Sequence, residues 1–404
     1  MVHLFLDAGV IAILVGLWEF FNRSIISVNF CINCCINSIF LPVKFTLPEL
    51  PARYVKLAIL VGLSLSVLAV AAILIDRISR GIDFSQGVCY ARVHMTRLGI
   101  ESGPGINSPF SFFGNLFGPA FLVPVAAVIL QPVSRRLAWT VGLVSFASLL
   151  ALSTVTASRT GIMLTGAFVT ALCCLRLMAN LPLPRLKWRD GIGVVFIVAL
   201  SAAFLLSIFV CRAQISDMDT SDYIESFSGH LGFVSEPGNA DRGRIFSVLG
   251  MAVLYVTHSA YTFAGIIGLE EKSGMIIFGA QRFLLARVGI DLGSAEWAFQ
   301  GRFPSVPGMF YHDFGLLGLI VLSLLLAGLV IGTLHVLKVM PGLLTIGVAA
   351  LAMTTLFLSP MLFAPDIIIF TFVAAQFVMV PAISWLAYQL LAKTWTGSDS
   401  RQRR

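Results

Sequence analysis

Long apolar runs separated by short polar segments dominate the hydrophobic pattern of this 404-residue chain. Most runs are about 20 residues long, enough for a helix to cross the ~30 Å hydrocarbon layer of a bilayer. Short alternating strands are missing from the pattern, so it predicts an all-α, polytopic membrane protein with about 12 spans and not a barrel. The predicted spans are 4–21, 24–43, 55–75, 112–131, 137–157, 160–179, 191–211, 245–268, 274–290, 310–334, 342–363 and 366–391.

Two of these spans are polar for a membrane crossing. The span 24–43 carries three asparagines at four-residue spacing, which form one stripe that would face other helices and not lipid. The span 274–290 contains a glutamine and two arginines, so a re-entrant or interfacial helix is an alternative to a crossing there.

Composition agrees with a lipid-embedded chain. Hydrophobic residues make up 58% and charged residues only 12%, with a mean hydropathy of +0.92, so a water-soluble core could not hide the apolar surface. We therefore expect residues 1–404 to form a single integral membrane domain. The net charge of +7 suits anionic head groups or a phosphate-bearing substrate, and the scattered basic residues do not resemble a nucleic-acid module.

Lysines and arginines in the short connections predict the orientation. They all fall on one side if the number of spans is even, and the positive-inside rule makes that side cytoplasmic, with both termini. These residues are Lys44, Arg53, Lys56, Arg135, Arg136, Arg185, Lys187, Arg189, Lys338, Lys393, Arg401, Arg403 and Arg404. A smaller loop, 76–111, and a large loop, 212–244, then lie outside.

The outer side still carries many arginines, including Arg77 and Arg80 in the smaller loop. Long loops escape the positive-inside bias, which is one explanation. An anionic substrate is the other, because guanidinium groups bind phosphate oxygens bidentately and stay charged. The tight-turn position of Arg159 favours function, since an unpaired charge is costly there. The arginines predicted to bind a phosphate group are Arg159, Arg242, Arg244 and Arg302.

Four residues are candidates for a general base. His230 and Glu236 lie in the loop 212–244, where solvated loop charges are the alternative explanation. His312 and Asp313 belong to the segment GRFPSVPGMFYHDFGLLG, which leads into an apolar run, and capping the start of a helix is their alternative role. A CxxCC cluster lies inside the span 24–43 without histidines, so packing is favoured over a zinc site, and we predict neither a metal nor a cofactor.

Several short segments together resemble a known family. They are the SRTG turn at 158–161, the large outer loop in the second half, the segment YVTHSAYTF at 255–263 and YHDFGLLG before a span. Over residues 55–391 this arrangement resembles the Wzy-type polymerases of O-antigen or exopolysaccharide repeat units, which are related to the O-antigen ligases.

The resemblance implies a metal-independent membrane glycosyltransferase of the GT-C type in the bacterial inner membrane. Its donor and acceptor would be undecaprenyl-diphosphate-linked oligosaccharides, its active face periplasmic, and a chain-length regulator a further partner. The four arginines named above would hold the diphosphate, and one of the four candidate bases would accept the proton of the acceptor hydroxyl. An O-antigen ligase and a lipid-linked oligosaccharide flippase are the alternatives.

Overall fold

The computed structural model describes residues 47, 49–85, 87–97, 108–156, 160–181 and 305–402, with scattered positions in 192–207 and 259–290. All of them belong to the larger of two units of the chain, Phe45–Arg404. Every regular element in these ranges is a helix, as the hydropathy pattern predicts. The predicted spans 4–21 and 24–43, with the asparagine stripe and the cysteine cluster, and the loop 212–244 lie outside the described residues.

Six helices of the described ranges are long and apolar enough to cross a membrane. They are α3 (Ala52–Ser79), the segment Pro109–Leu130, α7 (Arg135–Val155), α8 (Thr160–Met178), α13 (Val306–Val339) and the part Ile368–Leu391 of α15 (Ile368–Gln402). Each overlaps a predicted span, which supports a membrane protein. Helix α14 (Leu343–Leu358), at the predicted span 342–363, is shorter, with 16 residues. The total of twelve stays a prediction.

The structure differs from the sequence prediction at the span 112–131 and at the loop 76–111. The segment Pro109–Leu130 is a short helix α5 (Pro109–Phe117), a 3-10 turn η2 (Gly118–Phe121) and a helix α6 (Leu122–Leu130), because prolines within it remove backbone donors. The predicted loop 76–111 is also partly helical, since α3 continues to Ser79 and a ten-residue helix α4 (Val88–Arg97) follows.

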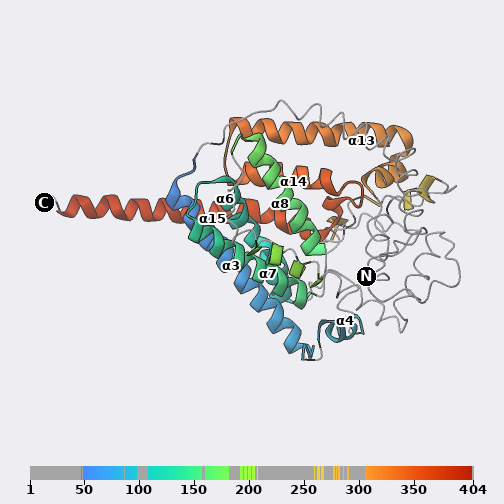
Figure 1. Ribbon diagram of the computed structural model, residues 1–404, viewed down its shortest axis with the longest axis horizontal. Coiled ribbons are helices and arrows are strands. Elements are labelled where there is room, and N and C mark those ends of the chain that lie inside the picture. The colour runs from blue at the N-terminus through green and yellow to red at the C-terminus, as the bar shows by residue number, and fades with distance from the viewer. Residues whose placement is uncertain are drawn as a thin grey trace, which may run out of the picture. The chain divides into compact units, whose positions relative to one another are not determined.

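Helix α3 packs against α5, η2, α6, α7 and α15 (Figure 1). The approach to α5 is close at Gly114, where an added Cβ would lie 2.1 Å from Ile73 Cγ1 and 2.9 Å from the Ala69 carbonyl oxygen. Small residues permit such close backbone contact between helices in lipid, where dispersion and hydrogen bonds drive association. The Ser66 hydroxyl adds one hydrogen bond of 2.9 Å to the Gly118 carbonyl.

Helix α14 lies between α13 and α15 and also contacts α8 (Figure 1). At Gly347 an added Cβ would lie 2.1 Å from the ring of Phe377, and this ring packs against Phe168 of α8 with centroids 5.4 Å apart. Helix α13 has few buried residues, and only 6% of its most apolar window is buried inside the structure. Most of its surface is therefore available to lipid.

Several helix ends lie on the same side of the bundle. Ser108, at the start of α5, is hydrogen-bonded to Asp76 near the end of α3, and the start of α8 lies beside Ile369 at the start of α15. The Val306 amide at the start of α13 donates to the carbonyl of Ser359, which follows α14, over 3.0 Å. We call this side of the bundle the Asp76 end. It is the side that the basic residues predict to be extracytoplasmic.

Candidate functional site

The structure describes two of the eight predicted site residues, His312 and Asp313, at the start of α13. The other six lie outside the described residues: Arg159, Arg242, Arg244, Arg302, His230 and Glu236. The chain neighbour of the first of these, Thr160, begins α8 at the Asp76 end. The described part of the candidate site is therefore the start of α13.

Local sequence determines where α13 begins. The Ser305 side chain caps the helix by accepting a hydrogen bond of 3.2 Å from the Gly308 amide, and Pro307 stands in the first turn, where a missing N–H costs nothing. Met309 and Phe310 then pack in a buried cluster with residues of other segments, and the Phe310 ring meets that of Phe363. This packing holds the first two turns of the helix in place.

The Asp313 side chain is fully buried, with an exposed fraction of 0%. Its carboxylate accepts hydrogen bonds from the Ile276 amide, at 2.9 Å to Oδ1 and 3.0 Å to Oδ2, and from the Ile277 amide, at 2.8 Å to Oδ2. Charge-assisted bonds of this kind are the strong ones in a protein interior. Asp313 therefore anchors the segment at 276–277 to α13 and does not cap its own helix.

His312 is the nearest titratable neighbour of this carboxylate. Its Nδ1 lies 2.7 Å from Asp313 Oδ1, and its side chain is only 3% exposed. Because the carboxylate oxygen accepts at this contact, Nδ1 is the donor and Nε2 the acceptor nitrogen of the ring. A histidine held in this tautomer by a buried carboxylate has the arrangement of a general base with its orienting group.

A break in the helix follows directly. Gly315 has φ 66° and ψ −163°, a conformation that only glycine adopts without strain, so α13 is two helices joined at this residue. At Gly318 an added Cβ would lie 1.9 Å from Phe314 Cβ, so this position also has no room for a side chain. The first helix carries His312 and Asp313, and the second is the long apolar part from Leu316 onward.

Other polar contacts lie around the same end of the bundle. The amide group of Gln281 donates to the Pro365 carbonyl and, over 3.1 Å, to the Thr371 hydroxyl. The Ser259 hydroxyl donates to the Pro360 carbonyl over 2.6 Å. The predicted span 274–290 thus has polar contacts at residues 276, 277 and 281.

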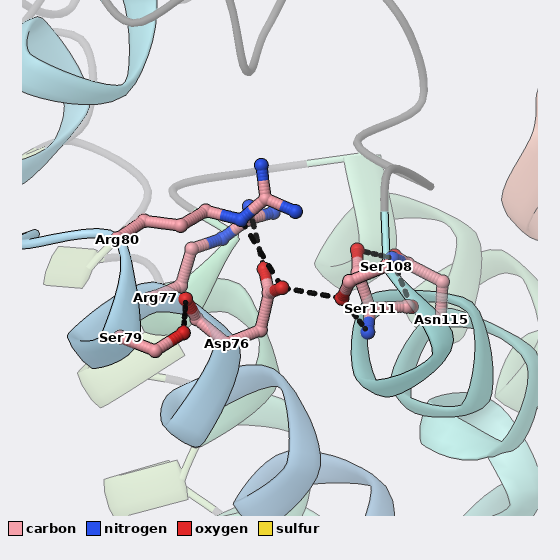
Figure 2. Close-up of polar contacts among 7 residues, drawn as sticks. All are labelled: Asp76, Arg77, Ser79, Arg80, Ser108, Ser111 and Asn115. Atoms are coloured by element: carbon pink, nitrogen blue, oxygen red, sulfur yellow. Dashed lines mark hydrogen bonds and ion pairs between the residues drawn. The ribbon is translucent and has the colours of Figure 1, made fainter.

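A second polar group lies at the junction of α3 and α5, and Figure 2 shows it in close-up. The Asp76 carboxylate pairs with Arg77 Nη1 at 3.2 Å and with Arg80 Nε at 3.1 Å, and it also accepts a hydrogen bond from the Ser108 hydroxyl. Ser108 in turn caps α5 by accepting from the Ser111 amide at 3.0 Å. We call Asp76, Arg77, Arg80 and Ser108 the α3 cluster.

From the sequence, Arg77 and Arg80 are expected to lie in an outer loop, and no partner is predicted for either of them. The structure places Arg77 in the last turn of α3 and Arg80 at its C-cap. One signal was available, because Asp76 and Arg80 are four residues apart, the spacing of neighbours on a helix face. The contact with Ser108 had no such signal. In the following turn, hydrogen bonds from the Ser85 hydroxyl and then its amide lower the pKa of Asp83.

The residues that the structure describes contain no group of three histidine, cysteine, aspartate or glutamate side chains that could hold a metal ion. In comparisons with known proteins, no family profile, no curated protein and no solved structure matches this chain.

Proposed function

We propose that the protein is a membrane glycosyltransferase that polymerises undecaprenyl-diphosphate-linked oligosaccharide repeat units at the periplasmic face of the bacterial inner membrane. The observation that carries the proposal is the buried pair of His312 and Asp313, joined over 2.7 Å at the start of a long apolar helix. Such a pair is costly at a membrane boundary, and intramembrane ionisable groups are commonly functional.

In the proposed reaction His312 is the general base and Asp313 is a positioning residue. The acceptor hydroxyl attacks the anomeric carbon of the donor, the bond from that carbon to the diphosphate oxygen breaks, and His312 Nε2 takes the hydroxyl proton. The lipid diphosphate leaves with the bonding electron pair. Attack opposite the leaving group inverts the anomeric centre.

The leaving diphosphate carries most of the charge that develops in the transition state. We assign its stabilisation to Arg159, Arg242, Arg244 and Arg302, because fixed guanidinium groups can neutralise it without a metal ion. In this proposal the diphosphate binds on the outer side, where the positive-inside rule predicts these four arginines. His312 is only 4% exposed, so the acceptor reaches it only when the site opens.

The arginine half of the proposal is tested by expressing single alanine and lysine variants at the four positions in the native host, after deletion of the chromosomal copy. We expect each alanine variant that inserts normally to lose polymer on surface-polysaccharide gels, and lysine to restore little, because it lacks the bidentate fork. The control is Arg136→Ala, an exposed arginine of α7. Full-length polymer in all four alanine variants would disprove the arginine assignment.

The base is tested in the same host with His312→Ala and Asp313→Asn, and with His335→Ala as the control, an exposed histidine of the same helix. We expect a loss of about 10²- to 10⁴-fold in turnover for His312→Ala. For Asp313→Asn a steep loss in kcat with a smaller change in KM would indicate a misplaced tautomer. Normal turnover in His312→Ala would rule out this histidine as the base.

The deletion strain separates the polymerase from its alternatives. Loss of a polymerase leaves single-repeat glycan on the acceptor, whereas loss of a ligase leaves finished polymer on its lipid carrier. Loss of a flippase leaves repeat units on the cytoplasmic side. A strain that accumulates lipid-linked polymer or cytoplasmic repeat units would contradict the proposal.

A further inference from the structure

We propose that the α3 cluster binds the phosphate group of a membrane lipid, with Arg77 and Arg80 as its ligands. This site is separate from the His312–Asp313 pair, and it does not depend on the glycosyltransferase proposal. It follows from the depth of the cluster in the membrane, from its excess of cationic donors and from the apolar surface around it.

The position of the cluster along α3 puts it at head-group depth. The uninterrupted uncharged stretch of α3 runs from Leu57 to Ile75, 19 residues, and spans about 29 Å as a helix. This length matches the hydrocarbon layer of a bilayer. Asp76 is the next residue, so the two arginines begin where the phosphates of bilayer lipids lie.

The cluster has more donors than its single carboxylate can satisfy. Arg77 is 4% exposed, and its Nε has no hydrogen-bond partner among the described residues. Asp76 divides its two oxygens among both arginines and the Ser108 hydroxyl. A buried guanidinium normally has its donors filled, because an unmet charged donor carries a high desolvation cost.

Arg80 connects the cluster to the outside. Its side chain is 28% exposed, and only its Nε contacts Asp76 in the described structure. Figure 2 shows its two terminal nitrogens directed away from that carboxylate. These nitrogens are the edge with which a guanidinium binds a phosphate bidentately. A phosphate can therefore bind here while the contact of Arg80 with Asp76 is kept.

A purely structural role explains part of this arrangement. Cations in the last turn of a helix interact favourably with its dipole, which accounts for one arginine at the end of α3. The helix dipole does not account for a second arginine that pairs with the same carboxylate, nor for the lack of a hydrogen-bond partner at Arg77 Nε among the described residues. The nearby Asp83 is exposed, and its carboxylate accepts a hydrogen bond of 2.8 Å from the Ser85 amide.

The surrounding surface selects a lipid over a free phosphate. Ile75 and Ile78, in the turn of α3 that also carries Arg77, are 54% and 59% exposed. On α5, just after Ser108, Phe110 and Phe112 are 55% and 45% exposed. Basic donors bordered by exposed apolar side chains match an amphiphile whose phosphate meets the arginines and whose chains lie along the helices.

The test uses the full-length protein in nanodiscs and measures lipid binding by native mass spectrometry. The probes are phosphatidylglycerol, a polyprenyl diphosphate, phosphatidylcholine and inorganic phosphate. The variant is Arg80→Ala, whose partly exposed side chain leaves Asp76 paired with Arg77, so that the fold is retained. The matched control is Arg136→Ala, which removes the same charge from an exposed site at the other end of the bundle.

We expect Arg80→Ala to weaken binding of phosphatidylglycerol or of polyprenyl diphosphate by about 10-fold or more, and Arg136→Ala to leave it unchanged. Arg80→Lys should recover part of the loss. The probe with the larger dependence on Arg80 identifies the source, a bilayer lipid or a lipid-linked substrate. Equal affinities for Arg80→Ala and wild type would overturn the site, and inorganic phosphate binding as tightly as the lipids would overturn the lipid assignment.

Discussion

Removal of the Asp313 carboxylate should release the segment at 276–277 from α13. In Asp313→Ala both backbone amides lose their acceptor, and together they make three contacts of 2.8 to 3.0 Å with that carboxylate. A hydrogen bond to a charged group contributes about 1.5–3 kcal/mol. Two amides therefore contribute about 3–6 kcal/mol to the free energy of opening this contact, before relaxation reduces the value.

The assay is hydrogen exchange of the peptide that contains Ile276 and Ile277, followed by mass spectrometry. At about 1.4 kcal/mol per factor of ten, exchange of these two amides should be about 10²- to 10⁴-fold faster in Asp313→Ala. Asp313→Asn keeps one acceptor oxygen but turns an NH₂ group toward the other donors. We therefore expect an intermediate acceleration of about 10- to 100-fold for it.

The control is Asp83→Ala, which removes an exposed carboxylate that accepts a hydrogen bond of 2.8 Å from the Ser85 amide. Exchange at 276–277 should not change in that variant. If Asp313→Ala exchanged at the wild-type rate there, the anchor would not exist in solution. Asp313 would then not position its neighbours.

Three further substitutions test the packing by thermal unfolding in detergent. Gly315→Ala should lower the free energy of unfolding by about 1–3 kcal/mol, because φ 66° with ψ −163° strains any residue with a side chain. The control is Gly328→Ala in the same helix, where the added methyl group meets open space and should have no effect. Equal effects of the two substitutions would contradict the break in α13. Gly114→Ala should lose about 1–3 kcal/mol against Ile73 and the Ala69 carbonyl, and a wild-type melting temperature would show that α3 and α5 do not approach so closely. Gln376→Leu removes the 2.7 Å hydrogen bond to the Leu116 carbonyl, but it also removes a buried side-chain oxygen that has no partner in the described structure. We expect these two effects on the free energy of unfolding nearly to cancel, so a loss of stability above about 1 kcal/mol would contradict this prediction.

Hydropathy located the helices well because the length of an apolar run is a local property of the chain. The predicted spans 55–75, 137–157 and 160–179 correspond closely to α3, α7 and α8. The boundaries were less accurate where polar residues continue a helix, since backbone hydrogen bonds carry α3 four residues beyond Ile75, the end of its uncharged run. For the same reason, hydropathy did not predict α4 within the loop 76–111.

The sequence by itself determined that this is a helical membrane protein and that His312 and Asp313 are candidates for a general base. Both conclusions depend on composition and residue type, which the sequence states directly. Only the tertiary structure decided what these residues contact. Asp313 binds amides 36 and 37 positions away, and Asp76 binds Ser108 across 32 positions. No local pattern encodes such pairs, since they depend on which helix ends come together. The break at Gly315 likewise depends on the backbone angles that the packed helix adopts, and a glycine in the sequence only permits them.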